Sequence, residues 1–157
     1  MKSDIFRPME DILKQYPCIV EQKIVWGEMD AFAHINNVAY FRYFETARIA
    51  YFEKVGVMEV METTGIGPIL HSTDCRYKIP LVYPDTVYLC ARITRLEKDR
   101  YNLENCVVSK KHQKVTAIGN GLCVCFNYEV QSKSEVPLIL REKILDFQRD
   151  CPPEIVE

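Results

Sequence analysis

The sequence lacks the features that mark membrane, secreted and nucleic-acid-binding proteins. No stretch approaches the roughly 18 uncharged apolar residues of a membrane span. Residues 1–10 mix charges and have no apolar run of the length that a secretory signal needs. The formal net charge is −2, which argues against a broad electrostatic grip on nucleic acid, because such binding needs many clustered cations. We therefore expect a soluble, cytoplasmic protein.

The sequence also lacks the usual signatures of metal and dinucleotide sites. Its seven cysteines form no CxxC pair, and most of them lie within apolar runs, as reduced and buried thiols do. The histidines, His34, His71 and His112, are not near paired cysteines, so no zinc site is expected. No GxGxxG motif is present, which argues against a Rossmann fold. We expect neither a metal nor a cofactor.

What is present is a pattern of helices and strands that suits a single domain of 157 residues. Such a chain can bury roughly 70 % of its unfolded surface. The expected order is a short helix or irregular arm at 5–14, a strand over Ile19–Trp26, a loop, the longest helix from Asn36 or Asn37 to near Gly56, a short helix at 57–62, strands near 68–79, 85–97, 100–110 and 114–128, and a helix at 138–149.

The longest predicted helix has a strong start signal and an apolar stripe. Asn36 and Asn37 suit the N-cap, and Gly56 suits the position just beyond the C-terminus. The stripe follows i, i+3, i+4, i+7 spacing and comprises Tyr40, Phe41, Phe44, Ala47, Tyr51, Phe52 and Val55. A helix this aromatic should be mostly wrapped by other structure. In the C-terminal helix, Ile139, Ile144, Leu145 and Phe147 are the expected packing residues.

The second half of the chain predicts a sheet that curls round this helix. The strand at 114–128 alternates small residues with larger ones, and the small ones are Ala117, Gly119, Gly121, Cys123 and Cys125. A face of small residues permits close approach, either of the central helix or of a second subunit. One long helix packed on about five mainly antiparallel strands gives an α+β fold.

The loop before the long helix carries the residues with chemical potential. A helix N-terminus offers free backbone N–H groups and a positive dipole end. These donors could bind the oxygen of a thioester carbonyl, with the Asn37 amide as the main candidate. Asp30 lies seven residues earlier and could act on the same carbonyl as a nucleophile or as a general base for water. His34 could fix the loop, orient Asp30 or contact the substrate.

The same residues resemble a known family. The run Trp26-Gly27-Glu28-Met29-Asp30, followed by Ala33-His34-Ile35-Asn36-Asn37 and Tyr40, is similar to the motif of the 4-hydroxybenzoyl-CoA thioesterase-like group of hot-dog proteins. The similarity continues through Tyr43–Arg48 and through Tyr77, Pro80 and Pro84-Asp85-Thr86-Val87. It covers roughly residues 18–130 of one hot-dog domain that spans residues 1–157, with an N-terminal arm and a C-terminal helix.

The resemblance implies an acyl-CoA thioesterase with CoA as part of the substrate. It implies a homodimer or homotetramer that pairs through its sheets, with the active site at the dimer interface. It maps the catalytic carboxylate onto Asp30 and the carbonyl-polarising amide onto Asn37 or its neighbour. The chain departs from the family motif at Glu28, which replaces Asp, and at Ala33, which replaces Gly. Alanine adopts a positive φ less readily than glycine, so Ala33 bears on the loop path.

Several further residues are candidates for substrate contact. Tyr40 and Phe44 could line an acyl pocket or belong to the core, and His71 and Thr73 could face the thioester from a neighbouring strand. Glu45 is a reserve carboxylate, although an ion pair with Arg48 is its expected role. Five cations could meet the phosphates of CoA or simply be solvated, and they are Arg76, Lys78, Lys110, Lys111 and Lys114.

The sequence therefore favours hydrolysis of a fatty-acyl or aromatic-acyl CoA to free acid and CoA. Two alternatives use the same fold. One is a non-catalytic module that binds acyl-CoA or an acyl carrier, which the alanine at position 33 would favour. The other is a hydratase, whose paired Asp and His would normally lie on a different loop–helix pattern.

Overall fold

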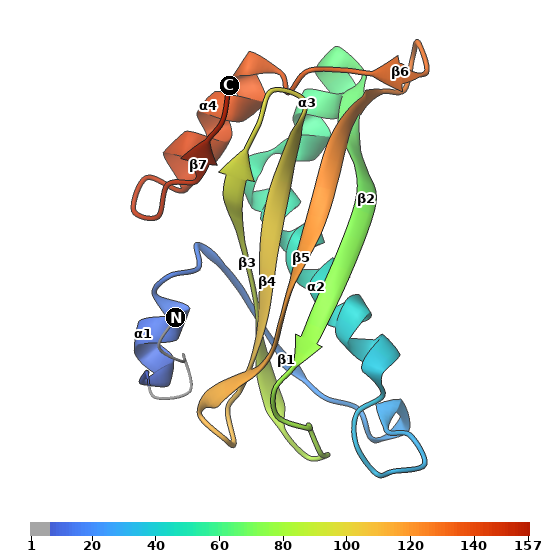
Figure 1. Ribbon diagram of the computed structural model, residues 1–157, viewed down its shortest axis with the longest axis vertical. Coiled ribbons are helices and arrows are strands. Elements are labelled where there is room, and N and C mark those ends of the chain that lie inside the picture. The colour runs from blue at the N-terminus through green and yellow to red at the C-terminus, as the bar shows by residue number, and fades with distance from the viewer. Residues whose placement is uncertain (1–6) are drawn as a thin grey trace.

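The computed structural model describes residues 7–157 as one long helix held in the curve of an antiparallel sheet (Figure 1). The helices are α1 (Met9–Leu13), α2 (Asn37–Val55), α3 (Val57–Thr64) and α4 (Leu138–Phe147), with a 3₁₀ turn, η2, at Trp26–Glu28. The strands are β1 (Cys18–Lys23), β2 (Ile66–Tyr77), β3 (Thr86–Leu96), β4 (Arg100–Ser109), β5 (Lys114–Asn127), β6 (Ser132–Lys133) and β7 (Glu154–Ile155).

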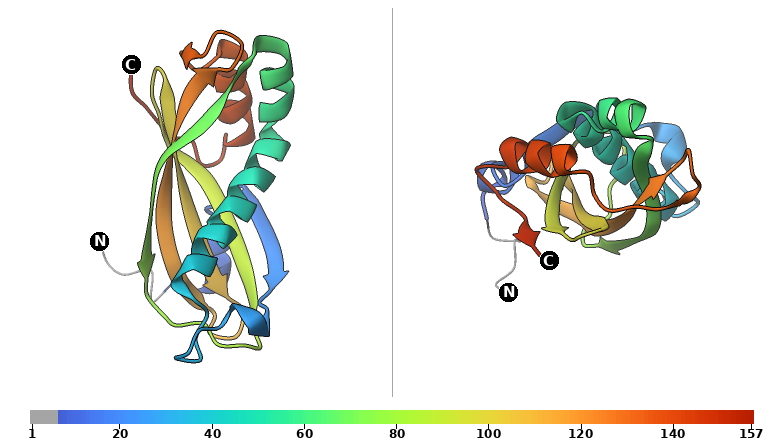
Figure 2. Two further views of the ribbon diagram at one scale, coloured as in Figure 1. Left: turned by 90° about the vertical axis from the view of Figure 1, so that its right-hand side faces the viewer. Right: turned by 90° about the horizontal axis from the view of Figure 1, so that it is seen from above.

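The sheet has the strand order β1-β3-β4-β5-β2, and every neighbouring pair in this path is antiparallel. The two-residue strands β6 and β7 pair with β5 and β3. Figure 2 shows the long strands curving along α2, which covers the inner face of the sheet. Figure 1 shows α1 beside the lower part of the sheet, where Ile12 and Tyr16 form a separate apolar cluster with outer-face residues of β3, β4 and β5. The predicted α+β class, with about five principal strands round a central helix, is confirmed.

Helix α2 begins and ends where its sequence signals place it. The Asn36 side chain accepts a hydrogen bond from the Val38 N–H, and Gly56 closes the C-terminus with φ of 90°. The stripe is confirmed except at Phe41, which is 37 % exposed, whereas Tyr43 is fully buried. The sheet wraps the side of α2 that carries Tyr43 and Ala47, so Phe41 lies at the edge of the contact.

The small residues of β5 leave space for side chains of α2 against the strand. A Cβ at Gly119 would stand 2.6 Å from Cε2 of Phe44 and 2.0 Å from the carbonyl oxygen of Asp74. Neither approach leaves space for a side chain. Of the two partners that the sequence allowed for this face, the central helix is therefore the one that packs against Gly119.

Three predicted details are corrected by the structure. The first strand ends at Lys23 rather than Trp26, because the chain turns into the 3₁₀ segment η2. The last helix ends at Phe147, and it buries Leu140 while Ile139 stays 51 % exposed. The N-terminal helix covers only Met9–Leu13, and residues 5 and 6 of its predicted range lie outside the described residues. Within residues 7–157, no helix is both long and apolar enough to cross a membrane.

Candidate active site

The loop between η2 and α2 is a tight hairpin built on Asp30. Met29 and Ile35 form an antiparallel bridge. Inside it, the Asp30 N–H donates to the His34 carbonyl at 2.9 Å and the Ala33 N–H donates to the Asp30 carbonyl at 3.0 Å. Asp at the first position of such a turn, with a left-handed residue at its end, is a recurrent hairpin arrangement. The loop is therefore a defined structure that fixes the backbone of Asp30.

Ala33 takes the conformation that glycine would supply. Its φ is 59°, in the left-handed region that alanine enters at a cost of about 1–2 kcal/mol. The loop closes with the hydrogen bonds described above, so alanine at this position is compatible with the closed hairpin.

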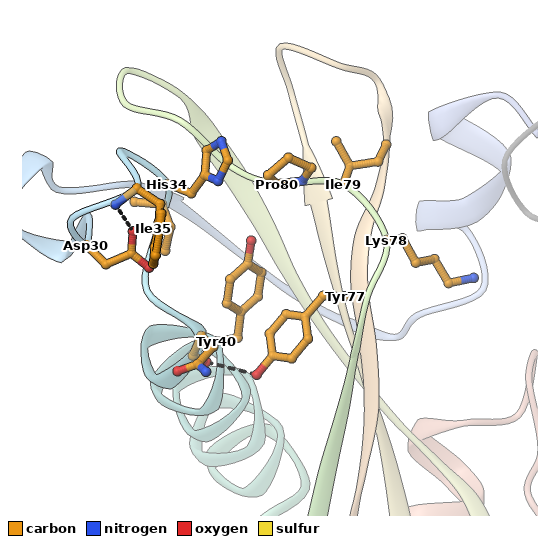
Figure 3. A pocket seen from close by; sticks show the side chains of 10 residues that line it. Asp30, His34, Ile35, Tyr40, Tyr77, Lys78, Ile79 and Pro80 are labelled. Atoms are coloured by element: carbon orange, nitrogen blue, oxygen red, sulfur yellow. Dashed lines mark hydrogen bonds between the residues drawn. The ribbon is translucent and has the colours of Figure 1, made fainter.

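The Asp30 carboxylate has one structural contact. Its Oδ1 accepts a hydrogen bond from the Phe32 N–H at 2.8 Å (Figure 3), which is an Asx turn. Its Oδ2 has no hydrogen-bond partner among residues 7–157. One oxygen thus holds the side chain in place, and the other is available to a substrate or a water molecule.

Glu28, which stands where the family has an aspartate, ties the loop to the helix. Its Oε1 accepts hydrogen bonds from the Val25 N–H at 3.1 Å and from the Tyr43 hydroxyl at 3.3 Å. Burial, followed by the nearby Glu28 carboxylate, raises the pKa of Tyr43 well above its ordinary value. Oε1 accepts both of these structural hydrogen bonds, and Glu28 does not line the cavity described below. Glu28 therefore supports the loop from outside the cavity.

The first turn of α2 contributes an unused backbone donor. The Val38 N–H is capped by the Asn36 side chain at 3.0 Å, and the Ala39 N–H donates to the Asn36 carbonyl at 3.0 Å. The Asn37 N–H has no acceptor among the described residues 7–157. Because the helix dipole places partial positive charge at this end, the Asn37 amide is suited to bind a carbonyl oxygen or an oxyanion.

Asp30 and Asn37 line one cavity of about 330 Å³. The lining residues are Asp30, Phe32, His34, Ile35, Asn37, Tyr40, Tyr77, Lys78, Ile79 and Pro80. They come from the loop, from the start of α2 and from the end of β2 with the segment that follows it (Figure 3). A hydrogen bond from the Ile35 N–H to the Leu81 carbonyl, 2.8 Å long, joins the two walls.

Two tyrosines, Tyr40 of α2 and Tyr77 of β2, meet where the two walls of the cavity approach each other. The rings of Tyr40 and Tyr77 meet edge to face with centroids 5.1 Å apart, and the Tyr77 hydroxyl donates to the Asn37 carbonyl at 3.1 Å. Burial raises the pKa of Tyr40 to about 12. Burial also raises the pKa of Tyr77, and the Cys75 thiol adds to this effect. Both hydroxyls stay protonated near neutral pH, so neither tyrosine supplies a phenolate base.

The structure brings together five of the residues that the sequence selects, namely Asp30, His34, Asn37, Tyr40 and Lys78. Phe44 is only 1 % exposed and packs on Gly119, so it belongs to the core in this chain. His71 and Thr73 lie exposed on β2 and do not line this cavity.

Glu45 also lies outside the cavity, and its predicted ion pair with Arg48 is wrong. Glu45 is exposed, whereas Arg48 is 8 % exposed and faces Gly121 on the sheet side of α2. No ion pair joins the two side chains within the described residues. The i, i+3 spacing permits contact, but the Arg48 guanidinium lies against the sheet while the Glu45 carboxylate faces solvent.

The sequence gives fewer signals for the opposite wall of the cavity. Tyr77, Ile79 and Pro80 come from some 40 residues downstream of the loop. Tyr77 and Pro80 belong to the second block that resembles the family, and that block is the one signal in the sequence that indicates them.

Comparison with known proteins places the chain among thioesterases. The model of the thioesterase-like superfamily matches residues 24–146. A protein of Aquifex aeolicus that is provisionally named an esterase is 28 % identical over 121 residues, which cover 73 % of this chain and 94 % of that protein. The chain is also 25 % identical to protein THEM6 of Danio rerio, but spans only 54 % of its length.

Two solved structures share the architecture. The PA2801 protein of Pseudomonas aeruginosa, assigned provisionally to the thioesterases by its name, is 28 % identical with a TM-score of 0.71, over 82 % of this chain and 98 % of that one. A thioesterase from Thermus thermophilus, solved with coenzyme A and zinc, is 23 % identical with a TM-score of 0.74, over 87 % and 98 % of the two chains.

Proposed function

Because the chain belongs to the thioesterase-like superfamily and is a thioester hydrolase of the hot-dog fold, we propose that it hydrolyses an acyl-CoA in the cavity between Asp30 and the start of α2. The observation that carries this proposal is the shared cavity of a carboxylate with a free oxygen and a helix-end N–H without an acceptor. A carboxylate and an oxyanion donor are the two groups that acyl transfer needs. The coenzyme A in the Thermus structure supports CoA as the thiol.

In the proposed mechanism, the thioester carbonyl oxygen accepts a hydrogen bond from the Asn37 N–H. Asp30 either attacks the carbonyl carbon or removes a proton from an attacking water molecule. The tetrahedral intermediate collapses with cleavage of the carbon–sulfur bond, and CoA leaves as a thiolate that takes up a proton. In the nucleophilic route, water then hydrolyses the acyl–Asp30 anhydride. His34 lines the same cavity and contacts the substrate, while Tyr40 forms part of the wall against the acyl group.

The role of Asp30 is tested by Asp30→Asn. The amide oxygen of asparagine can still accept the Phe32 N–H, so the Asx turn and the fold should persist. The neutral side chain can neither take a proton nor attack, and we expect kcat to fall roughly 10²–10⁴-fold. The measurement is thiol release from a panel of fatty-acyl and aromatic-acyl CoAs, with thermal unfolding to confirm the fold. Full turnover by the variant would remove Asp30 from the mechanism.

The role of the Asn37 amide is tested by Asn37→Pro. Proline is well suited to the first helical position, and Asn36, with φ of −57° and ψ of 140°, already has the extended conformation that a following proline requires. The change removes the backbone N–H together with the asparagine side chain, and we expect the loss of the N–H to lower kcat roughly 10²–10³-fold. Asn37→Ala is the matched control, because it removes the side chain and keeps the amide. Equal activity of the two variants would show that the amide does not bind the oxyanion.

We further propose that two copies of the chain pair through β2. This strand is 12 residues long, lies at the end of the sheet path and carries exposed side chains along most of its length, and such edges favour pairing with another strand. Pairing there would give His71 and Thr73 a partner surface. Four apolar residues between the end of β1 and the first turn of α2 are also exposed, and they are Val25, Trp26, Phe32 and Val38. A second subunit that covered them would exclude water from the site.

The dimer is tested by sedimentation of the wild type and of Ile69→Lys. Ile69 is 40 % exposed on β2, and a lysine there should oppose pairing of the edge strand. Ile155→Lys is the matched control, because Ile155 is 49 % exposed on β7. We expect the wild type and the control to sediment with twice the mass of Ile69→Lys. A monomeric wild type that retains full activity would refute the dimer.

A further inference from the structure

A second cavity, of about 300 Å³, lies on the outer face of the sheet beneath α1 and the residues that follow it. It is lined by Ile12, Gln15, Tyr16, Arg76, Lys78, Arg92, Glu104, Cys106, Val115 and Ile118. The lining side chains from the sheet come from β3, β4, β5 and the end of β2. Four strands at a spacing of about 4.8 Å make a cleft roughly 14 Å wide.

The positive charges in this cleft exceed the negative ones. Glu104 is its one carboxylate, and it accepts hydrogen bonds from the Tyr16 hydroxyl at 2.7 Å and the Arg92 Nε at 3.1 Å, with Arg92 Nη2 2.8 Å away. Glu104 and Arg92 therefore neutralise each other. Arg76 and Lys78 have no ion-pair partner among residues 7–157. The cleft thus offers two uncompensated cations.

The neighbours of Arg76 do not neutralise it. Asp74 lies two residues earlier on the same face of β2, but its Oδ1 accepts the Asn120 N–H at 3.2 Å instead of pairing with Arg76. Arg76 is opposite Ile118 in the register of β2 and β5, and Ile118 is opposite Cys106 of β4. The guanidinium therefore lies at the rim of an apolar floor, where an anion would keep its attraction to the cation better than in open solvent.

The two cavities meet at the end of β2. Lys78 lines both of them. Figure 3 shows its side chain on the far side of the strand from Asp30 and His34. Because side chains alternate along a strand, Tyr77 faces the first cavity while Arg76 and Lys78 extend toward the second. One elongated ligand can therefore occupy both cavities by crossing the strand end at Lys78.

We propose that the outer cleft binds the phosphates of the adenosine 3′,5′-bisphosphate half of CoA, while the thioester lies beside Asp30. The identity of the ligand rests on the proposed function. Arg76 would hold a phosphate through paired N–H groups, and Lys78 would act as a point charge where the arm crosses the strand. The wall formed by Ile12 and Tyr16 precedes residues 24–146, which are the part of the chain that matches the family. This nucleotide site thus depends on a segment outside the family match.

The kinetic test compares an acyl-CoA with the same acyl group on pantetheine, which lacks the nucleotide. For Arg76→Ala, we expect KM for the acyl-CoA to rise roughly tenfold or more, since a charged hydrogen-bonding partner of the phosphate is lost. The ratio of kcat/KM for the CoA thioester to that for the pantetheine thioester should fall by the same factor. Arg76→Lys should restore part of the ratio that Arg76→Ala loses. Lys133→Ala, on β6, is the matched control and should leave the ratio unchanged.

The binding test uses adenosine 3′,5′-bisphosphate itself and needs no turnover. Calorimetry should show binding to the wild type and at least tenfold weaker binding to Arg76→Ala, and the nucleotide should inhibit competitively with acyl-CoA. If the wild type binds the nucleotide, Arg76→Ala binds it at least tenfold more weakly and the protein hydrolyses no acyl-CoA, the proposed function would be overturned and the nucleotide site would stand. Hydrolysis with an unchanged KM in Arg76→Ala would overturn the site alone. Equal displacement of the nucleotide by inorganic phosphate would also overturn it, because the cleft would then be a general anion site.

Discussion

At the scale of single residues, the site depends on backbone conformations as much as on side chains. Asp30 is held by the Asx turn to Phe32, and Ala33 closes the same turn with φ of 59°. Gln113 and Gln131 have φ of 57° and 55° and lie in other turns of the chain. The three positions share one strained conformation, but only Ala33 lies beside the site.

Replacing Ala33 by glycine should stabilise the protein without changing the loop. Glycine adopts a positive φ at little steric cost, so we expect the free energy of unfolding to rise by about 1 kcal/mol and Tm by roughly 2–4 °C. Chemical and thermal unfolding measure both quantities, and thiol release should stay at the wild-type rate.

Gln113→Gly is the matched control for this prediction, because it relieves the same strain in the hairpin between β4 and β5. A similar gain in both variants would assign the effect to backbone strain. A loss of stability in Ala33→Gly alone would mean that the Ala33 methyl group makes a compensating contact, and would contradict the strain argument.

At the scale of elements, side chains of α2 reach the glycines of β5 across the inner face of the sheet. Phe44 lies against the backbone of β5 because Gly119 has no side chain. The next glycine on the same face, Gly121, has more room, since a Cβ there would be 3.3 Å from the tip of the Leu70 side chain. The two glycines therefore differ in function although both belong to one small-residue stripe.

Gly119→Ala should be strongly destabilising and Gly121→Ala close to neutral. At position 119 the new methyl group would overlap the Asp74 carbonyl at 2.0 Å, and that carbonyl belongs to the β2–β5 pairing. We expect a loss of about 3 kcal/mol or more, at the upper end of overpacking costs. At position 121 the flexible Leu70 side chain can move. Urea unfolding of both variants checks the difference, and equal stabilities would show that Phe44 and β2 can shift freely.

The elements also show what the sequence can and cannot predict about the site. Asp30, His34, Asn37 and Tyr40 lie within 11 consecutive residues, so one cap signal and one motif locate them together. The facing wall depends on the register of β2 with β5, which places Tyr77 rather than His71 or Thr73 beside the start of α2. Strand alternation predicts that β2 exists, but it does not fix which end of β2 meets the helix. For the same reason, spacing alone could not show that Arg48 faces the sheet.

At the scale of the whole molecule, burial is the main influence of the fold on the pKa values of Cys123 and Cys125. Five of the seven cysteines are buried, among them Cys123 and Cys125 on the inner face of β5. Burial raises the pKa of Cys123 from 9.0 to about 11, against a small lowering by Arg48, and the pKa of Cys125 from 9.0 to about 12. These two thiols therefore stay neutral and poorly nucleophilic at neutral pH.

These shifts predict a loss of stability at alkaline pH. The raised pKa belongs to the folded state, so the contribution of each thiol is complete below the unfolded value of 9.0 and is lost as the pH rises from 9 toward 11 for Cys123 and toward 12 for Cys125. Each group can remove at most about 1.4 kcal/mol per pH unit in this window. Urea midpoints measured at pH 8, 9, 10 and 10.5 under reducing conditions should be nearly constant up to pH 9 and then fall.

Two cysteine variants separate the contributions of the thiols. In Cys123→Ala the fall of the midpoint above pH 9 should be shallower than in the wild type. Cys151→Ala, which alters a half-buried thiol, should keep more of the wild-type slope. A wild-type midpoint that is unchanged between pH 8 and 10.5 would contradict the idea that these thiols are held neutral by the fold.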